Sequence, residues 1–227
     1  GIARTFAAEG ARVIVADIDE AAARTVAAEV GGTALRVDVA SAESVAAMAA
    51  GAAATLGRVD ILVNNAGVTH LPALLEEVSE ADFDRVFAVN CKSVYLTARA
   101  LVPMMKKAGR GAILNVASTA GLSPRPRLNW YNASKGWMIT ATKAMAVELA
   151  PAGVRVNAIC PVAGETPLLK SFLGEDTPEM RARFLATIPI GRFSTPQDIG
   201  NAACFLCSDE ASMITGVALE VDGGRCI

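Results

Sequence analysis

The chain of 227 residues has little charge, few aromatic rings and a single histidine. Charged residues make up 19% of it and aromatic residues 5%, whereas hydrophobic residues reach 52%. This balance excludes intrinsic disorder and predicts a large buried core. A net charge of −2 offers no basic surface to nucleic acid or to an anionic membrane. We therefore expect neither kind of partner.

Long hydrophobic runs are missing as well. The longest apolar stretch, Val45 to Ala54, is rich in alanine and too short to span a bilayer. The start of the chain lacks the charged region and apolar core of a secretion signal. Five cysteines are an odd number for a disulfide framework and suit a reducing compartment. We expect a soluble, cytoplasmic protein.

The scarcity of histidine also argues against a metal centre. His70 has no second imidazole to join it, although it follows a turn from which it could contact a substrate. Cys204 and Cys207 have the spacing of a redox or zinc pair. They lie in the apolar pattern Ile199 to Leu206, which predicts a helix, so we favour a structural role for both and expect no metal.

The order of the apolar segments predicts the fold. No linker, charge block or repeat divides residues 1–227, which indicates one domain. Short, continuously apolar runs alternate with longer segments that favour helices, a pattern of strands buried on both faces. This predicts an α/β fold with a doubly wound parallel sheet. The expected strands are Arg12 to Ala16, Ala34 to Val39, Val59 to Asn64, Ala112 to Ala117, Arg155 to Ile159 and Ala218 to Val221.

Polar residues gather where these strands end. Asp17, Asp38, Asn64, Ser118 and Pro161 each lie at or just past a carboxyl end, the edge at which such sheets bind ligands. Asp17 can accept hydrogen bonds from a ribose and repel a 2′-phosphate, which favours NAD over NADP. The alternative is that Asp17 serves as a cap for the helix that follows.

Tyr131 and Lys135 are spaced for proton chemistry. Four residues apart on a helix, their side chains share one face. A neighbouring ammonium favours the phenolate, so the pair could exchange a proton at a pH where an isolated tyrosine would not. Ser118 stands thirteen residues before Tyr131.

Further motifs accompany this pair. They are Asp38-Val39, Asn64-Asn65-Ala66-Gly67, Asn90 in Phe87-Ala88-Val89-Asn90, and Val221-Asp222-Gly223-Gly224. Together with Ser118, Tyr131 and Lys135 they resemble the short-chain dehydrogenase/reductase family in order and spacing over essentially the whole chain. The resemblance implies a three-layer Rossmann-type domain and an oxidoreductase that transfers a hydride between NAD and a secondary alcohol or ketone. It also implies a homotetramer, packed through the apolar helices around Phe87 to Met105 and Met138 to Leu149.

The resemblance also assigns roles. It implies that Tyr131 is the general acid/base, that Ser118 holds the substrate oxygen, and that Lys135 lowers the pKa of the tyrosine and binds the nicotinamide ribose. Asn90 is expected to position a water that relays protons from Lys135. The cofactor contacts that it implies beside Asp17 are Asp38, Val39, Asn64, Ala66, Gly67, Tyr131, Lys135, Pro161 and Thr166.

One segment departs from the family pattern. Val162 follows Pro161 where the family usually has glycine, and the glycine is displaced to Gly164. Thr166 keeps its distance from Pro161, so we expect its contact with the nicotinamide carboxamide to survive, but the backbone path between them is open. Leu168 to Leu185 corresponds to the variable substrate lid of the family.

The substrate is not determined by these motifs. Arg125 and Arg127 precede Tyr131 and could hold a carboxylate or phosphate, although exposed loop arginines are usually only solvated. One alternative function is an NADPH-dependent 3-oxoacyl carrier-protein reductase, against which Asp17 and the net charge argue. Another is a non-catalytic nucleotide-binding scaffold, against which the set of Ser118, Tyr131 and Lys135 argues.

The resemblance finally predicts something about the start of the chain. Family members begin with a strand and a glycine-rich turn that holds the pyrophosphate, and both would precede Gly1. Gly1 to Glu9 then corresponds to the remainder of the first helix. We expect roughly twenty further residues in the functional polypeptide, with their strand between those ending at Asp17 and Asn64. Without that strand we expect poor folding and weak NAD binding.

Overall fold

A computed structural model describes residues 1–164, 169 and 177–227 of the protein. Within these residues six strands are present: β1 (Ile14–Asp17), β2 (Thr33–Arg36), β3 (Ile61–Asn64), β4 (Gly111–Val116), β5 (Val154–Pro161) and β6 (Ala218–Val221). All of their pairings are parallel. The α-helices are α1 (Ile2–Ala8), α2 (Glu20–Glu29), α3 (Ala42–Leu56), α4 (Glu80–Phe87), α5 (Ser93–Ala108), α6 (Asn129–Leu149), α8 (Pro178–Leu185) and α9 (Pro196–Cys207). Short helical turns are η1 (Leu75–Glu77), η2 (Ala88–Lys92), η3 (Thr119–Gly121), η4 (Ala150–Ala152) and η5 (Asp209–Ala211).

Side-chain caps determine where several helices begin. The Asp19 carboxylate accepts the N–H groups of Ala21 and Ala22 at the start of α2. Thr195 caps α9, reinforced by Asp198 and by a proline at the first helical position. Asp19, not Asp17, is therefore the cap of α2, and the alternative role considered for Asp17 is wrong.

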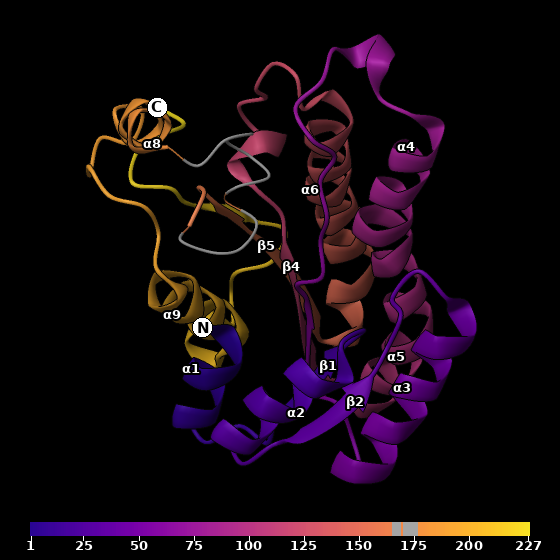
Figure 1. The fold of residues 1–227 in the computed structure, drawn as a ribbon. Helices are drawn as coiled ribbons and strands as arrows, with labels where there is room; N and C mark the ends of the chain where they lie inside the picture. Colours follow the sequence, from indigo (N-terminus) through magenta and orange to yellow (C-terminus); the bar gives the residue numbers. More distant parts are fainter. Residues whose placement is uncertain (165–168, 170–176) are drawn as a thin grey trace.

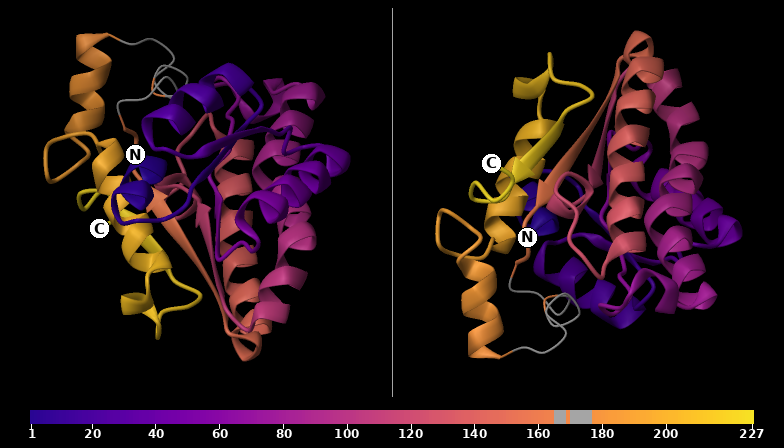
Figure 2. Two further views of the ribbon diagram at one scale, coloured as in Figure 1. Left: turned by 90° about the horizontal axis from the view of Figure 1, so that it is seen from below. Right: turned by 90° about the horizontal axis from the view of Figure 1, so that it is seen from above.

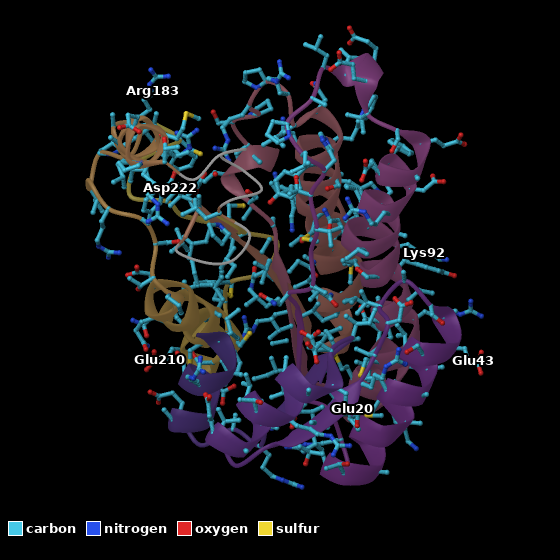
Figure 3. All side chains as sticks on the ribbon, in the orientation of Figure 1. Glu20, Glu43, Lys92, Arg183, Glu210 and Asp222 are labelled. Atoms are coloured by element: carbon cyan, nitrogen blue, oxygen red, sulfur yellow. The ribbon has the colours of Figure 1, made fainter. Side chains whose placement is uncertain are left out.

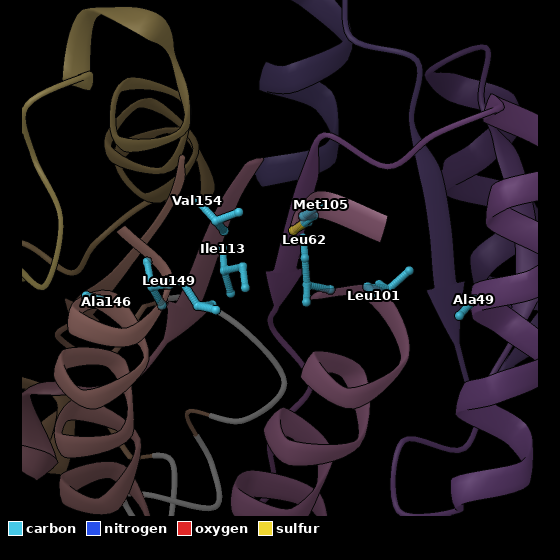
Figure 4. Close-up of a cluster of buried hydrophobic side chains, with 9 residues drawn as sticks. Ala49, Leu62, Leu101, Met105, Ile113, Ala146, Leu149 and Val154 are labelled. Carbon is cyan, nitrogen blue, oxygen red and sulfur yellow. The ribbon is translucent and has the colours of Figure 1, made fainter. Parts of the chain in front are cut away.

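Helices cover both faces of the sheet (Figures 1 and 2). On one face, Leu101 of α5 and Leu149 of α6 meet Ile113 of β4 in a buried cluster (Figure 4). On the other face, Phe6 of α1 and Leu206 of α9 pack against the same sheet. The result is a three-layer α/β/α arrangement, as the sequence predicts.

The sheet is interrupted between β1 and β3. Strand β1 pairs only with β2, and the remaining strands form a separate sheet in the order β3-β4-β5-β6. In the described part of the chain, no ladder of hydrogen bonds joins β1 to β3. The interruption lies between the strands that end at Asp17 and Asn64, the place where the sequence predicts an additional strand.

The expected elements are confirmed, with two corrections. The segment Gly1 to Glu9 contains helix α1, and Ile199 to Leu206 lies within α9. Strand β2 ends at Arg36, so Asp38 and Val39 lie in the loop beyond it and not at the end of the strand itself. Burial on both faces holds for β4 and β5 but is wrong for β1 and β2, because each of these two strands lies at an open edge and carries exposed residues. Among the described helices, none is both long and apolar enough to cross a bilayer.

Candidate active site

Ser118 lies just beyond the carboxyl end of β4. Its hydroxyl accepts the N–H of Ala120 at 3.1 Å and so caps the turn η3. Gly121 closes this turn against helix α6: a Cβ there would lie 2.7 Å from the backbone carbonyl carbon of Lys135. Because Gly121 has no side chain, the turn η3 can approach α6 closely, and this approach places Ser118 beside the helix that carries Tyr131 and Lys135.

Tyr131 and Lys135 lie one turn apart on α6, and both are buried, at 4% exposed each. The Lys135 ammonium lies 5.8 Å from the centroid of the Tyr131 ring and donates to the carbonyl of Val116 at 2.8 Å. A side-chain hydrogen bond links Tyr131 to Ser118. The three residues predicted to carry the chemistry therefore meet at one place.

Burial changes the acidity of this pair. It raises the pKa of Tyr131, and this effect outweighs the hydrogen bond from Ser118 and the charge of Arg125, which both act in the opposite direction. Burial lowers the pKa of Lys135 to about 8, against smaller opposite effects from Cys91 and Cys160. Burial thus sets the direction of the pKa shift of Tyr131 in the chain by itself, and the expected effect of Lys135 on that pKa remains a prediction.

Asn90 lies in the π-helical turn η2, which joins α4 to α5. Its amide donates to the carbonyl of Val68 and to the Ser134 hydroxyl, both at 2.9 Å, and its carbonyl accepts the N–H of Val68 at 2.9 Å. The side chain is fully buried. Asn90 therefore ties the loop after β3 to the turn of α6 that carries Tyr131 and Ser134, and its predicted role in placing a water remains a prediction.

Asn64 belongs to a buried chain of polar groups beneath the site. Its amide donates to the Asn115 carbonyl at 2.8 Å, and its carbonyl accepts the Thr97 hydroxyl at 2.8 Å. The Asn115 amide in turn donates to the Thr142 hydroxyl at 2.8 Å. The Asn64 side chain is thus committed to connecting α5, β3, β4 and α6, and it leaves the backbone of this residue as the part that a cofactor could meet. Asn115, which the sequence reading missed, shares the strand-end position of the other polar residues.

The remaining predicted cofactor residues are more open. Asp17 is exposed, and its carboxylate accepts the N–H of Asp19 at 3.0 Å. Asp38 likewise accepts the N–H of Ala40 at 2.9 Å. Val39 packs at the margin of a small cluster around Val37, and Ala66 is exposed in the loop after β3.

The segment after β5 is held by a second strand-like contact. Val162 is buried in a cluster with Phe184 and Phe193. Gly164 forms a bridge with Ser194, whose hydroxyl donates to the Val162 carbonyl at 3.2 Å. A Cβ at Gly164 would lie 2.8 Å from that hydroxyl oxygen, so the displaced glycine has a steric reason. Thr166 and residues 168 and 170–176 of the predicted lid lie outside the described residues, whereas its last part contains α8. Pro161 ends β5 at the edge of the site.

The two predicted arginines separate in the structure. Arg127 is exposed and has a φ of 66°, the only positive φ among the described non-glycine residues. Arg125 instead lies over the Phe184 ring, with Cζ 4.8 Å from the centroid, and Arg225 lies over the same ring at 5.0 Å. Arg225 and Phe184 were missed because no local sequence pattern links the C-terminal tail to α8.

His70 and the cysteines contribute little to this geometry. His70 is buried at 2% exposed, with Nδ1 2.8 Å from the Leu71 carbonyl oxygen. Cys204 and Cys207 are free and lie in α9, so the predicted helix is confirmed, and burial raises the pKa of Cys207 to about 12. A structural role for both remains a prediction. In the described ranges, no three His, Cys, Asp or Glu side chains gather as metal ligands.

The residues around the site fit a dinucleotide. A Cβ at Gly67 would lie 3.4 Å from the Lys135 ammonium nitrogen and 3.6 Å from the Asn90 carbonyl oxygen, so the missing side chain leaves a cradle in front of both groups. The exposed Asp17 carboxylate provides an acceptor for a ribose at the other end. Tyr131, Lys135 and the loop Asn64 to Gly67 would hold the nicotinamide half.

Comparison with known proteins agrees with this geometry. The family model described as enoyl-(acyl carrier protein) reductase matches residues 1–225. The chain is 48% identical to 4-formylbenzenesulfonate dehydrogenase of Comamonas testosteroni, over 100% of this chain and 92% of that protein. It is 39% identical to 3-oxoacyl-[acyl-carrier-protein] reductase of Thermotoga maritima, over 98% of this chain and 90% of that protein.

A solved structure of 3-ketoacyl-(acyl-carrier-protein) reductase from Brucella melitensis, complexed with NADH, matches with a TM-score of 0.95 and 50% identity. The match covers 100% of this chain and 92% of that one. A buried Ser, Tyr and Lys at the carboxyl edge of a parallel sheet, together with these full-length matches, settle the family. The chain belongs to the short-chain dehydrogenase/reductase family and is an NAD(P)-dependent oxidoreductase by membership.

Proposed function

We propose that this protein transfers a hydride between NAD and a secondary alcohol, ketone or aldehyde, with Tyr131 as the general acid/base. The observation that carries the proposal is the convergence of Ser118, Tyr131 and Lys135 in one buried place. The names of two relatives support it, since one is a dehydrogenase of an aldehyde and the matched solved structure holds NADH.

Ser118 and Tyr131 have different roles in the proposed reaction. The bound nicotinamide would supply or accept the hydride. Ser118 donates a hydrogen bond to the substrate oxygen and stabilises the charge that develops there. Tyr131 gives its phenolic proton to that oxygen in reduction and takes it back in oxidation. Because burial raises its pKa, Tyr131 is protonated at neutral pH in the free chain, which is the form that reduction needs.

Asp17 is the residue on which cofactor choice would depend. Its carboxylate is exposed at the end of β1 and does not cap α2. An acid at this position favours a free ribose hydroxyl over a 2′-phosphate. The second candidate function is reduction of a 3-oxoacyl group on a carrier protein, favoured by the name of the matched Brucella structure. Comparing turnover of 3-oxoacyl thioesters with that of simple alcohols, ketones and aldehydes separates the two.

Exposed apolar side chains support an oligomer. Tyr95 on α5 is 54% exposed and Val147 on α6 is 81% exposed, on the helices expected to meet copies of themselves. A homotetramer with closed symmetry would bury both faces. Five free cysteines suit the reducing cytoplasm, where we propose that the protein works.

Replacing Tyr131 with Phe tests the mechanism. The change removes the phenolic hydroxyl and little else, so we expect turnover to fall by about 10²–10⁴-fold while the affinity for NAD stays nearly constant. Tyr95→Phe is the matched control, because Tyr95 is the other tyrosine of the chain and lies exposed on α5. Steady-state kinetics and NAD titration provide both readouts. Turnover of the Tyr131 variant within about threefold of wild type would contradict the proposal.

A further inference from the structure

Ser134 lies between Tyr131 and Lys135 on α6, but the proposed reaction gives it no role. Its side chain is fully buried. The hydroxyl donates to the backbone carbonyl of Tyr131 at 2.7 Å and accepts an N–H of the Asn90 side-chain amide at 2.9 Å. One buried oxygen therefore joins the backbone of the proposed acid/base to a different element of the fold.

Asn90 extends this connection to the loop that follows β3. Its amide also donates to the carbonyl of Val68, and its carbonyl oxygen accepts the N–H of Val68, both at 2.9 Å. Both N–H groups and the oxygen of the Asn90 side chain are thus used. Lys92, two residues later in η2, is by contrast exposed at the outer side of the molecule (Figure 3). The buried side of η2 is committed to an unbroken chain of hydrogen bonds from Val68 to Tyr131.

The loop at the far end of this chain of hydrogen bonds belongs to the proposed cofactor site. Gly67 directly precedes Val68, and a Cβ on Gly67 would lie 3.4 Å from the ammonium nitrogen of Lys135. The loop would hold the nicotinamide, whereas α6 carries the phenol. Hydride and proton are transferred to neighbouring atoms of one substrate, so these two elements must keep a fixed relation during the reaction.

The helix itself does not need a hydroxyl at this position. Alanine is a better helix former than serine, so Ser134 contributes nothing to α6 that alanine would not. The hydrogen bond to Asn90 is what alanine could not supply. A fully paired polar network in a buried place fixes one arrangement of the groups that it joins, because any other arrangement leaves a donor or an acceptor without a partner.

We propose that Ser134 is a positioning residue that fixes the phenol of Tyr131 relative to the loop at Gly67 and Val68. It acts through the backbone carbonyl of Tyr131 on one side and through Asn90 on the other. The assignment rests on the proposed function, because it gives Ser134 a part in the same reaction. Loss of the hydroxyl would leave one N–H of Asn90 unpaired and would release the turn that carries the phenol.

Kinetics of Ser134→Ala test this role. We expect kcat to fall by about 10–100-fold, the effect of a displacement of about 1 Å at reacting groups. Turnover is expressed per NAD-binding site, counted by titration, so that a loss of folded protein does not enter the value. The KM for the substrate should change by less than about threefold, because the lost contact acts on the transition state. A kcat per binding site within about threefold of wild type would overturn the proposal.

Ser93→Ala is the matched control. Ser93 is also a buried serine of a helix, and its hydroxyl donates to the carbonyl of Val89 at 2.5 Å, within the same helical stretch. This variant should keep kcat per binding site within about threefold of wild type. Ser134→Cys retains a weak donor and acceptor, so its kcat should lie between those of Ser134→Ala and wild type. Equal losses of kcat in Ser134→Ala and Ser93→Ala would indicate loosened packing around η2 and would overturn the positioning role.

Crystal structures of wild type and Ser134→Ala separate this proposal from the proposed function, because they need no turnover. In the variant we expect the Tyr131 hydroxyl to move relative to Val68 by more than about 0.5 Å, the tolerance of a catalytic arrangement. Such a movement in a protein that turned over no alcohol, ketone or aldehyde would support the role of Ser134 and contradict the proposed function. A Tyr131 hydroxyl that stayed in place would overturn the role of Ser134, whatever wild type turned over.

Discussion

The two sheets of the molecule are positioned by different kinds of contact. Around the proposed catalytic residues, hydrogen bonds connect distant parts of the chain: Lys135 donates to the carbonyl of Val116 in β4, and Asn90 donates to Ser134 in α6. At the ends of β1 and β2, Asp17 and Asp38 each accept an N–H only two residues further along. The catalytic side is thus fixed by the whole fold, and the side proposed for the adenosine is shaped by its own turns. Preorganisation is concentrated where charge would develop during the reaction.

Hydrogen exchange gives the widest test of this difference. Strands β4 and β5 are buried and paired on both sides, whereas β1 and β2 form a separate pair with exposed residues. We expect the amides of β4 and β5 to exchange only on global unfolding, and those of β1 and β2 to exchange through local opening, at least about a hundredfold faster. Mass spectrometry of exchanged peptides reads the two regions separately. Equal protection in both would break the comparison.

Two glycines at the contact between η3 and α6 test how Ser118 is positioned. A Cβ at Gly121 would lie 2.8 Å from the backbone nitrogen of Gly136, so Gly121→Ala must displace η3 and Ser118 from α6. We expect a loss of about 1–3 kcal/mol in unfolding free energy and a fall in kcat. A Cβ at Gly136 meets only the Gly121 carbonyl oxygen, at 3.7 Å, and Gly136→Ala should stabilise α6 by up to about 1 kcal/mol.

Thermal and chemical unfolding of both variants, with kcat beside them, provide the measurement. The contact is the same, and only the side from which the methyl group enters differs. If both variants lost stability equally, the close approach of η3 to α6 would not be what positions Ser118.

The buried ammonium makes the stability of the catalytic side depend on pH. Lys135 has a folded pKa of about 8, below its ordinary 10.5. Between these values the unfolded chain binds a proton that the folded chain does not, so the unfolding free energy rises with pH by up to about 1.4 kcal/mol per unit. The difference between wild type and Lys135→Met, measured by denaturant unfolding, should therefore grow in favour of wild type from pH 8 to 10.5. Cys91 and Cys160 interact with Lys135, so measurements between pH 8 and 9, below their raised pKa values of about 11 and 12, give the cleanest comparison. A flat difference would contradict the burial of a titrating lysine.

Asp17→Ser tests the adenosine side, with the smallest expected effect. Removing the carboxylate should lower the ratio of kcat/KM for NAD to that for NADP by about tenfold, or about 1.4 kcal/mol. Asp19→Ser is the matched control, because serine still caps α2 while a neighbouring negative charge is removed. A ratio that changes equally in both variants would show that only net charge near β1 matters.

Sequence reasoning succeeded where the determining interactions are local. The spacing of Tyr131 and Lys135 puts them on one helix face, and the strand-end rule places Ser118 beside them. It could not foresee that desolvation would raise the pKa of Tyr131, because burial is a property of the assembled fold. The diversion of the Asn64 side chain into a buried network has the same origin.

The arginines show this limit most directly. Arg125 and Arg127 are near neighbours in the sequence, but Arg127 has a positive φ, which no local residue pattern predicts. The backbone at Arg127 therefore turns in a way that the sequence does not indicate. Arg225 joins Arg125 only because the Asp222 turn returns the tail across α8. Contacts between segments that are distant in the chain are the feature that a single sequence predicts least well.

The π-helical turn has a consequence for how this chain can change over generations. Helix α4, the turn Ala88–Lys92 and helix α5 follow one another without interruption, and the N–H of Ser93 bonds the carbonyl of Ala88, five residues back. Loss of one codon within the turn would let all three segments close into a single α-helix, a gain in regular hydrogen bonding. It would also rotate everything on one side by about 100° and carry Asn90 away from Ser134. At this turn a substitution leaves the flanking helices in place, whereas the deletion of one residue rotates one of them. Proteins that keep the reaction must therefore also keep the number of residues in the turn.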